Sequence, residues 1–251
     1  MFDLTGRRAL ITGGSRGIGA ACVTVFSAAG AEVAFSWRER SDRADALVAE
    51  LADAGRSAHA IRADLGSREG CEHLVGDAVA QLGGLDILVH NAGIWTGGVI
   101  ESMSDEIWRE TMQVNLDSAF YLTRAAVGHL RERSHGRIIY ITSTAAQRGE
   151  AEHSHYAASK GALQSLTKSL AVELAPDRIT VNALAPGWVL TDMVSDTLSV
   201  EEIAEVEKII PRGCMAHPED IARPVAFLAS DGAVHITGEI LNVNGGAVLC
   251  G

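Results

Sequence analysis

The strongest indication of the fold is the glycine-rich segment Thr12-Gly13-Gly14-Ser15-Arg16-Gly17-Ile18-Gly19. It follows a short apolar run, Ala9–Thr12, and leads into a helical pattern that continues through Ala29. Strand, glycine-rich turn and helix come in the order of a dinucleotide-binding site, where glycines let backbone N–H groups approach a pyrophosphate and the helix N-terminus adds partial positive charge. The spacing G-x-x-x-G-x-G differs from the general G-x-G-x-x-G fingerprint. By itself, the motif therefore leaves an ordinary loop open as an alternative.

Short apolar runs alternate with longer helical patterns along the whole chain. The runs are Ala9–Thr12, Val33–Phe35, Ala58–Arg62, Ile87–His90, Ile138–Thr142, Thr180–Ala185 and Ile240–Val243. Strands that alternate with helices indicate βαβ units and a parallel sheet. We expect an α/β fold of the Rossmann type: a single doubly wound parallel sheet with helices on both faces, in one domain over residues 1–251.

Two stretches interrupt this alternation. Ala145–His155 is polar and irregular, and Trp188–Pro211 carries a turn followed by a charged helical segment. Doubly wound folds bind their ligands in loops that follow the carboxyl ends of strands. We therefore expect both stretches to lie at the ligand site.

The composition is that of an acidic globular protein. Of 251 residues, 47% are hydrophobic, and the formal net charge is −11. An acidic surface argues against nucleic acid or an anionic membrane as partner, and no apolar run approaches the roughly 20 residues that cross a bilayer. The four cysteines form no C-x-x-C pair, which favours free thiols in a reducing compartment. We expect a cytoplasmic protein with no bound metal.

Tyr156 and Lys160 are the candidate acid/base pair. They begin a long helical pattern, and residues four apart lie on one helix face. A free tyrosine has a pKa of about 10, and a neighbouring ammonium lowers that pKa. The phenol then exchanges a proton with a substrate oxygen near neutral pH. Y-x-x-x-K by itself is usually a surface helix pair, so the pattern needs support from other motifs.

Ser143 and Asn115 are two further candidates. Ser143 follows the run Ile138–Thr142, thirteen residues before Tyr156, where its hydroxyl could hold the reacting oxygen. Asn115 lies inside a helical pattern, Glu106–Leu130, although asparagine is a poor helix former. A turn or capping serine and a locally satisfied asparagine are the structural alternatives.

Together these motifs resemble the short-chain dehydrogenase/reductase family, in its single-domain branch, over essentially the whole chain. Thr12–Gly19 is similar to the family's T-G-x-x-x-G-x-G, and Asn115, Ser143, Tyr156 and Lys160 are similar to its catalytic tetrad. Three other segments resemble family motifs, two of them with a single departure: His90-Asn91-Ala92-Gly93 (N-N-A-G, with His90 in place of asparagine), Pro186-Gly187 with Thr191 (P-G-x-x-x-T), and Val243-Asn244-Gly245-Gly246 (D-G-G, with Asn244 in place of aspartate).

The resemblance implies a role for each residue of the tetrad. Tyr156 is the acid/base, Ser143 positions the reacting oxygen, Lys160 lowers the tyrosine pKa and holds the nicotinamide ribose, and Asn115 holds a water that links Lys160 to solvent. The cofactor supplies the hydride. The cofactor-binding residues that the resemblance implies are Gly13, Ser15, Arg16, Gly17, Ile18, Gly19, Ser36, Arg38, Asp64, Leu65, Asn91, Ala92, Gly93, Tyr156, Lys160, Pro186, Gly187, Val189 and Thr191.

The end of the second predicted strand favours NADP(H) over NAD(H). An NAD enzyme places a carboxylate there, which would repel a 2′-phosphate. This chain has Ser36, a neutral donor, and Arg38, which can make a planar charge-assisted contact. Arg16 matches a second basic position of NADP-preferring family members. Solvent-facing arginines are the alternative, and Glu39 keeps NAD(H) possible, because a one-residue shift would bring its carboxylate to the ribose.

The expected activity is interconversion of a small-molecule ketone and a secondary alcohol, with 3-oxoacyl reduction as one candidate. Two alternatives stay open: a non-catalytic dinucleotide-binding or regulatory protein on the same fold, and a sugar or polyol dehydrogenase that uses NAD. By resemblance, we expect a homotetramer that pairs the helices Glu106–Leu130 and Tyr156–Ala175.

Four aromatic residues lie beside these motifs. His153 and His155 precede Tyr156, but a zinc site needs a third ligand, so a role in a substrate loop is the stronger interpretation. Trp95 and Trp188 follow two site motifs. They are candidates for the substrate wall, with core packing as the alternative.

Overall fold

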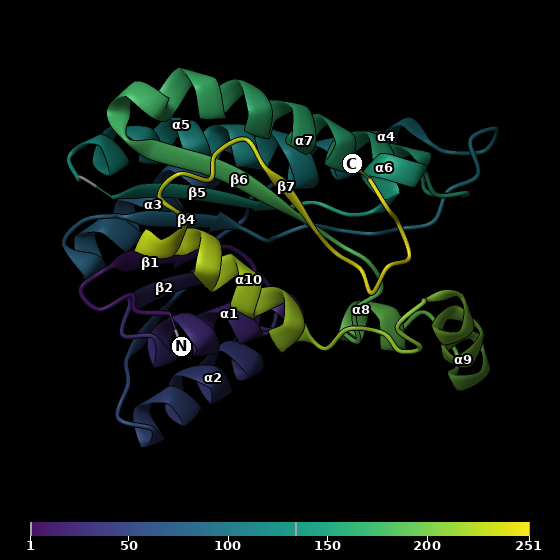
Figure 1. The fold of residues 1–251 in the computed structure, drawn as a ribbon, viewed down its shortest axis with the longest axis horizontal. Helices are drawn as coiled ribbons and strands as arrows, with labels where there is room; N and C mark the ends of the chain where they lie inside the picture. Colours follow the sequence, from purple (N-terminus) through teal and green to yellow (C-terminus); the bar gives the residue numbers. More distant parts are fainter. Residues whose placement is uncertain (1, 134, 251) are drawn as a thin grey trace.

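The computed structural model describes residues 2–133 and 135–250, and this part of the chain contains one parallel sheet. Its strands are β1 (Arg8–Ile11), β2 (Glu32–Trp37), β3 (Ala58–Arg62), β4 (Ile87–His90), β5 (Gly136–Ile141), β6 (Ile179–Pro186) and β7 (Ile240–Val243). Their order in the sheet is β3-β2-β1-β4-β5-β6-β7 (Figure 1). The predicted doubly wound parallel sheet is confirmed, and every predicted strand overlaps an observed one.

Helices cover both faces of the sheet. They are α1 (Gly17–Ala28), α2 (Ser41–Asp53), α3 (Arg68–Leu82), α4 (Asp105–Met112), α5 (Ser118–Arg131), α6 (Ala145–Arg148), α7 (Ser154–Leu174), α8 (Asp192–Ser195), α9 (Val200–Ile209) and α10 (Pro218–Ala229). In Figure 1, α5 and α7 lie on one side of the sheet, and α1, α2 and α10 lie on the other. The pair α8 and α9 stands at the carboxyl end of the strands, to the right.

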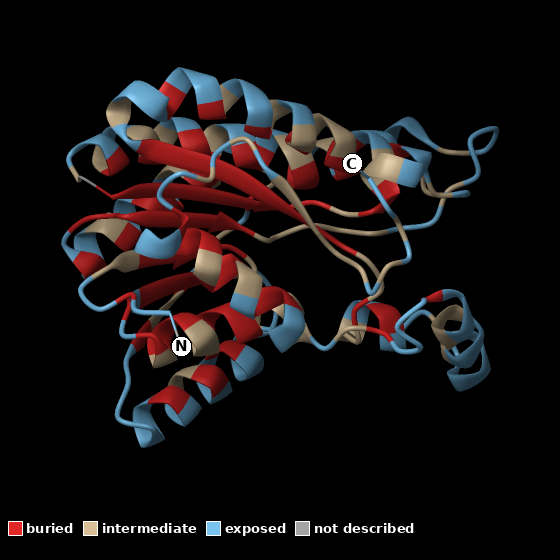
Figure 2. Cartoon of the chain, in the orientation of Figure 1, coloured by how far each residue is buried: buried red, intermediate tan, exposed pale blue. Residues whose placement is uncertain are grey.

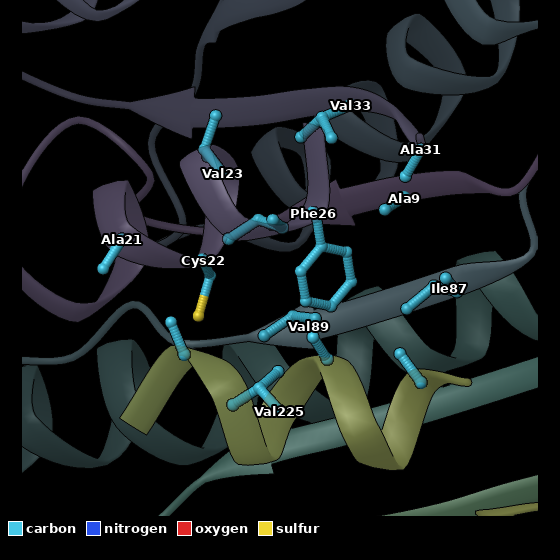
Figure 3. Close-up of a cluster of buried hydrophobic side chains, with 14 of the residues drawn as sticks. Ala9, Ala21, Cys22, Val23, Phe26, Ala31, Val33, Ile87, Val89 and Val225 are labelled. Atoms are coloured by element: carbon cyan, nitrogen blue, oxygen red, sulfur yellow. The ribbon is translucent and has the colours of Figure 1, made fainter. Parts of the chain in front are cut away.

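The sheet is buried on both faces, which is why its strands read as continuous apolar runs (Figure 2). On one face, Phe26 and Cys22 of α1 pack against Val89 of β4 and Val225 of α10 (Figure 3). A second cluster fills the other face beneath α3, α5 and α7. Burying a side chain such as Phe26 contributes roughly 1.5–3 kcal/mol.

Polar side chains set several helix starts. Ser67 accepts a hydrogen bond from Gly70 N (3.0 Å) at the start of α3, and Ser104 accepts from Ile107 N (3.3 Å) at the start of α4. Ser199 and Glu202 form a reciprocal capping box at α9. Such caps satisfy backbone N–H groups that have no partner inside the helix.

Two sequence expectations need correction. Ala145–His155 is not irregular throughout: Ala145–Arg148 forms α6, because the Ser143 hydroxyl accepts from Ala145 N (3.0 Å) and starts the turn. The predicted helix Glu106–Leu130 is not one α-helix either. A π-helical turn, Gln113–Asp117, separates α4 from α5.

The order of the strands determines where a ligand binds. The chain moves outward from β1 to β3, then returns to place β4 on the other side of β1. At this switch point, the loops after β1 and β4 diverge and leave a crevice at the carboxyl ends of the strands. The site therefore begins at the glycine turn after β1.

Candidate active site

The glycine turn is held between β2 and β4. Gly13 N donates to the Ser36 hydroxyl (3.1 Å), and Gly14 N donates to the Ser36 carbonyl (2.9 Å). From the other side, the Asn91 amide donates to the carbonyls of Thr12 (2.9 Å) and Gly13 (3.2 Å). The buried Thr12 hydroxyl in turn accepts from the N–H groups of Asn91 and Ala92, both at 3.0 Å. These contacts fix the turn at the switch point.

Glycine is required at two positions of this turn by close packing. A Cβ on Gly14 would lie 2.5 Å from the Phe35 Cβ, and one on Gly19 would lie 2.1 Å from the Gly13 carbonyl oxygen. Gly13 and Gly17 have φ of +65° and +54°, which side chains rarely adopt. The turn and the N-terminus of α1 thus form a cradle that fits a pyrophosphate.

Ser143, Tyr156 and Lys160 come together beside this cradle. Ser143 follows β5, and the other two side chains come from the first turns of α7. All three line a cavity of about 530 Å³ that continues to the glycine turn. The Lys160 ammonium donates to the Ile141 carbonyl at the end of β5 (2.8 Å) and lies 5.8 Å from the Tyr156 ring centroid.

Burial controls the protonation of this group. Burial raises the pKa of the Tyr156 phenol to about 12; the Ser143 hydrogen bond acts to lower it, and the Glu150 carboxylate acts to raise it. Burial also lowers the pKa of Lys160 to about 8. The pKa of Tyr156 therefore shifts in the direction opposite to the predicted one, because desolvation of the phenolate is the largest influence on it. Tyr156 is a neutral phenol at neutral pH.

Asn115 lies in the π-helical turn and is fully buried. Its amide nitrogen donates to the carbonyl of Ile94 (3.0 Å) and to the Ser159 hydroxyl (3.1 Å), and its oxygen accepts from Ile94 N (2.8 Å). Ser159 in turn donates to the Tyr156 carbonyl (2.7 Å). Asn115 thus joins the loop after β4 to the start of α7, and its interruption of the helix is a feature of the site.

The cavity collects most of the predicted cofactor residues. The predicted residues that line it are Gly13, Ser15, Arg16, Gly17, Ile18, Ser36, Arg38, Asp64, Leu65, Asn91, Ala92, Gly93, Tyr156, Lys160, Pro186, Gly187, Val189 and Thr191. Gly19 lies beneath the turn and serves it through packing.

The residues at the end of β2 are arranged differently from the prediction. Ser36 is buried, and its hydroxyl accepts a hydrogen bond from Gly13 N, so it supports the turn. Arg38 lines the cavity but is half exposed and pairs with Glu39 at 2.6 Å. The charges of Arg38 and Glu39 therefore neutralise each other. Arg16 is exposed at the start of α1.

Ile141, Arg148 and Glu150 are among the residues of the site that the sequence did not identify. The Ile141 carbonyl receives the Lys160 ammonium, and a main-chain acceptor leaves no signal in the sequence. Arg148, the last residue of α6, and Glu150, in the loop that follows, also line the cavity. Arg148 and Glu150 lie between Ser143 and Tyr156 in the sequence, and this position could have indicated that they belong to the site.

The two histidines before Tyr156 have different environments. His153 stacks on Trp95, whereas His155 is fully buried. Among the described residues, no three His, Cys, Asp or Glu side chains gather as metal ligands do. No helix in residues 2–133 and 135–250 is long and apolar enough to span a bilayer.

His90, at the end of β4, departs from the family pattern. Its Nε2 lies 2.7 Å from the Ser118 hydroxyl, which itself donates to the Val114 carbonyl (2.7 Å). Nε2 must therefore carry the proton, and the ring is neutral. Burial lowers the pKa of His90 to about 3, and the nearby Lys160 acts in the same direction.

We expect His90 to make the fold acid-sensitive. An unfolded histidine binds a proton below about pH 6.5, whereas folded His90 resists protonation until about pH 3. Stability should therefore fall by up to about 1.4 kcal/mol per pH unit as the pH drops through this window. Urea unfolding at a series of pH values should show that the free energy of unfolding falls less steeply with decreasing pH in His90→Asn. The control His73→Asn, at an exposed position, should keep the pH dependence of the wild type. Equal slopes in all three proteins would contradict this prediction.

Comparison with known proteins agrees with this geometry. A family model described as enoyl-(acyl carrier protein) reductase matches residues 13–248. The chain is 37% identical to a 3-oxoacyl-[acyl-carrier-protein] reductase of Synechocystis over 250 residues, 99% of this chain and 100% of the relative. It is 40% identical to an acetoacetyl-CoA reductase of Shinella zoogloeoides over 243 residues, 96% of this chain and 98% of the relative.

Solved structures agree as well. A short-chain dehydrogenase/reductase from Serratia marcescens superposes with a TM-score of 0.92 at 39% identity, covering 97% of this chain and 98% of that one. A blue fluorescent protein from a metagenomic library, solved in complex with NADPH, gives a TM-score of 0.92 at 38% identity, covering 98% and 100%. The chain belongs to the short-chain dehydrogenase/reductase family. Within that family it is an oxidoreductase similar to the 3-oxoacyl reductases.

Proposed function

We propose that the protein is an NADP-dependent ketoreductase that interconverts a ketone and a secondary alcohol, with Tyr156 as the acid/base. The observation that carries the proposal is the shared cavity, which joins the glycine cradle to Ser143, Tyr156 and Lys160. When bound, the cofactor supplies the hydride. The relative solved with NADPH supports the choice of cofactor.

Tyr156 carries the proton that reduction of a ketone requires. Because its pKa is raised to about 12, the phenol carries a proton that it can donate to the oxygen of the ketone as the alkoxide forms. The Ser143 hydroxyl, bonded to the same phenol, orients the carbonyl oxygen through a second hydrogen bond. The Lys160 ammonium, fixed on the Ile141 carbonyl, holds positive charge next to the phenol and would hold the nicotinamide ribose of a bound cofactor.

Asn115 holds the loop that carries Gly93 and Ile94. A Cβ on Gly93 would lie 3.2 Å from both the Asn115 oxygen and the Lys160 Nζ, so these two polar atoms border the same small space. The Asn115 oxygen accepts one hydrogen bond, from Ile94 N, and therefore has one lone pair left to accept another. A water held there would connect Lys160 to solvent and resupply the proton.

Absorbance of NADPH with a panel of ketones and acyl thioesters tests the activity. Oxidation of NADPH that requires a ketone is the expected result. Binding of NADPH without turnover of any member would favour a regulatory dinucleotide-binding protein instead. Turnover only with NAD and a sugar or polyol would favour the dehydrogenase alternative.

We expect NADPH to be used in preference to NADH. The Arg38 guanidinium is the charge at the end of β2 that can reach a 2′-phosphate once it leaves Glu39. Arg38→Ala should reduce the ratio of kcat/KM for NADPH to that for NADH by about tenfold, because it removes one charge-assisted contact with the 2′-phosphate. Glu39→Gln should raise it by freeing Arg38. Arg43→Ala, exposed on α2, is the control, and a ratio unaffected by Arg38→Ala would refute the assignment.

We also expect a cytoplasmic homotetramer. By resemblance, pairing uses the helices that here are α4 with α5, and α7. Large apolar side chains are exposed on them: Trp108 (42%), Phe120 (47%) and Val172 (79%). Light scattering at micromolar concentration should give the mass of four chains of 26.5 kDa, and Phe120→Glu should yield smaller species. A monomeric wild type would contradict the prediction.

A further inference from the structure

Three aromatic rings pack against one another, and two of them line the cavity. Trp95 comes from the loop after β4, Trp188 from the loop after β6, and His153 from the residue before α7. The His153 ring stacks on Trp95, with centroids 4.6 Å apart and planes 12° apart. Trp95 and Trp188 meet nearly at right angles, with centroids 5.9 Å apart at 86°. Both indoles line the cavity together with Tyr156.

The two indoles are held before any ligand arrives. Trp188 packs against the apolar cluster Val194, Ile210 and Met215 beneath α8 and α9. Trp95 is fixed by the stacked His153, whose Nδ1 lies 3.1 Å from the Ala151 carbonyl oxygen. A rigid pair of large rings at right angles makes a corner that receives a flat group at little cost in conformational entropy.

A carboxylate borders the same space. Glu150 lines the cavity, is half buried, and lies close enough to raise the pKa of the Tyr156 phenol. Arg148 also lines the cavity, but its side chain is exposed. Glu150 therefore adds a negative charge to the cavity lining, which also holds the Lys160 ammonium. An anionic group next to a substrate carbonyl would face this carboxylate at short range and be repelled.

We infer that the site selects uncharged ketones whose carbonyl carries a flat ring. This inference rests on the proposed reduction of ketones. Trp95 and Trp188 receive the ring, and Glu150 rejects ketones that bear a carboxylate next to the carbonyl. The hydride and proton reach the carbonyl carbon and oxygen from NADPH and Tyr156, so the product is the matching secondary alcohol. Aromatic contact with the corner is worth roughly 2–10-fold in kcat/KM over an equally large aliphatic ring.

A matched pair of ketones tests the aromatic corner. Acetophenone should be reduced with a kcat/KM at least twofold above that of cyclohexyl methyl ketone, and the ring ketone should quench tryptophan fluorescence. In Trp95→Leu the preference should fall to about one, whereas Phe2→Leu, which packs against Phe227 and lies outside the cavity lining, should keep it. A wild type that prefers the cyclohexyl ketone would overturn the inference, as would a preference that survives in both Trp95→Leu and Trp188→Leu.

A second pair tests the charge. Methyl benzoylformate should be reduced at least tenfold more efficiently than the benzoylformate anion. Glu150→Gln should narrow this gap at least threefold, and Glu152→Gln, exposed two residues away, should leave it unchanged. Equal use of ester and anion by the wild type would overturn the role of Glu150. If acyl thioesters are reduced without ring or charge preference, this inference fails alone; if no ketone or thioester is reduced, the proposed function fails.

Discussion

Tyr156→Phe is expected to lower kcat for ketone reduction by at least about 100-fold, since general acid–base catalysis contributes roughly 10²–10⁴-fold. The variant loses only the hydroxyl, and the ring keeps its place near the Lys160 ammonium. Binding of NADPH, followed by fluorescence titration, should change little. The loss should appear in kcat and not chiefly in KM, because the proton is needed only as the alkoxide forms.

A matched substitution elsewhere separates chemistry from structure. Tyr121→Phe removes a hydroxyl from α5, where the ring lies under Arg124 and far from the cavity lining. It should keep wild-type kcat. If Tyr156→Phe retains more than about a tenth of wild-type kcat, the proton comes from another group, and the assignment is wrong.

Gly19→Ala is expected to remove measurable NADPH binding, with an increase in Kd of at least about 100-fold, or about 2.7 kcal/mol. The added Cβ would lie 2.1 Å from the Gly13 carbonyl oxygen and 2.7 Å from the Asn91 amide nitrogen. A backbone carbonyl cannot move aside, so the turn itself must shift. The N–H groups that form the phosphate cradle shift with it.

Gly76→Ala is the control for this substitution. Gly76 also lies within a helix, α3, but an added Cβ there meets no atom within 4 Å. It should bind NADPH normally and gain up to about 1 kcal/mol of stability from helix propensity. Isothermal titration and thermal melts of both variants decide the matter. Normal NADPH affinity in Gly19→Ala would mean that the turn is not the phosphate site.

Much of the fold could be predicted because its signals are local. Strands of a parallel sheet are buried on both faces, so β1 and β5 appear as apolar runs between helical patterns. The strand–turn–helix order at Thr12–Gly19 placed the cradle correctly. The π-helical turn could not be predicted, because it arises from the hydrogen bonds of Asn115 with a loop twenty-one residues away.

The chemistry of the site was harder to predict than its members. Tyr156 and Lys160 lie together in the cavity, but the direction in which the tyrosine pKa shifts depends on burial that only the packed structure reveals. Ser36 lies at the end of β2 as predicted, but its role differs, because its hydroxyl oxygen accepts a hydrogen bond from Gly13 N. The pairing of Arg38 with Glu39 likewise depends on rotamers, which a sequence does not specify.

The strand order also bears on how the chain is assembled during synthesis. After β4 has joined β1, each later strand adds to the outer side of its predecessor, so the sheet can grow in the order in which the ribosome releases it. The last addition, β7, supplies the Val243 carbonyl that binds Gly187 N (3.0 Å). The Pro186–Thr191 wall of the cavity is held earlier by Thr144 and Ala216, and it gains this further anchor only when β7 emerges. A nascent chain that stalls before β7 already contains Tyr156 and Lys160, yet it lacks the bond that ties Gly187 to the edge of the sheet.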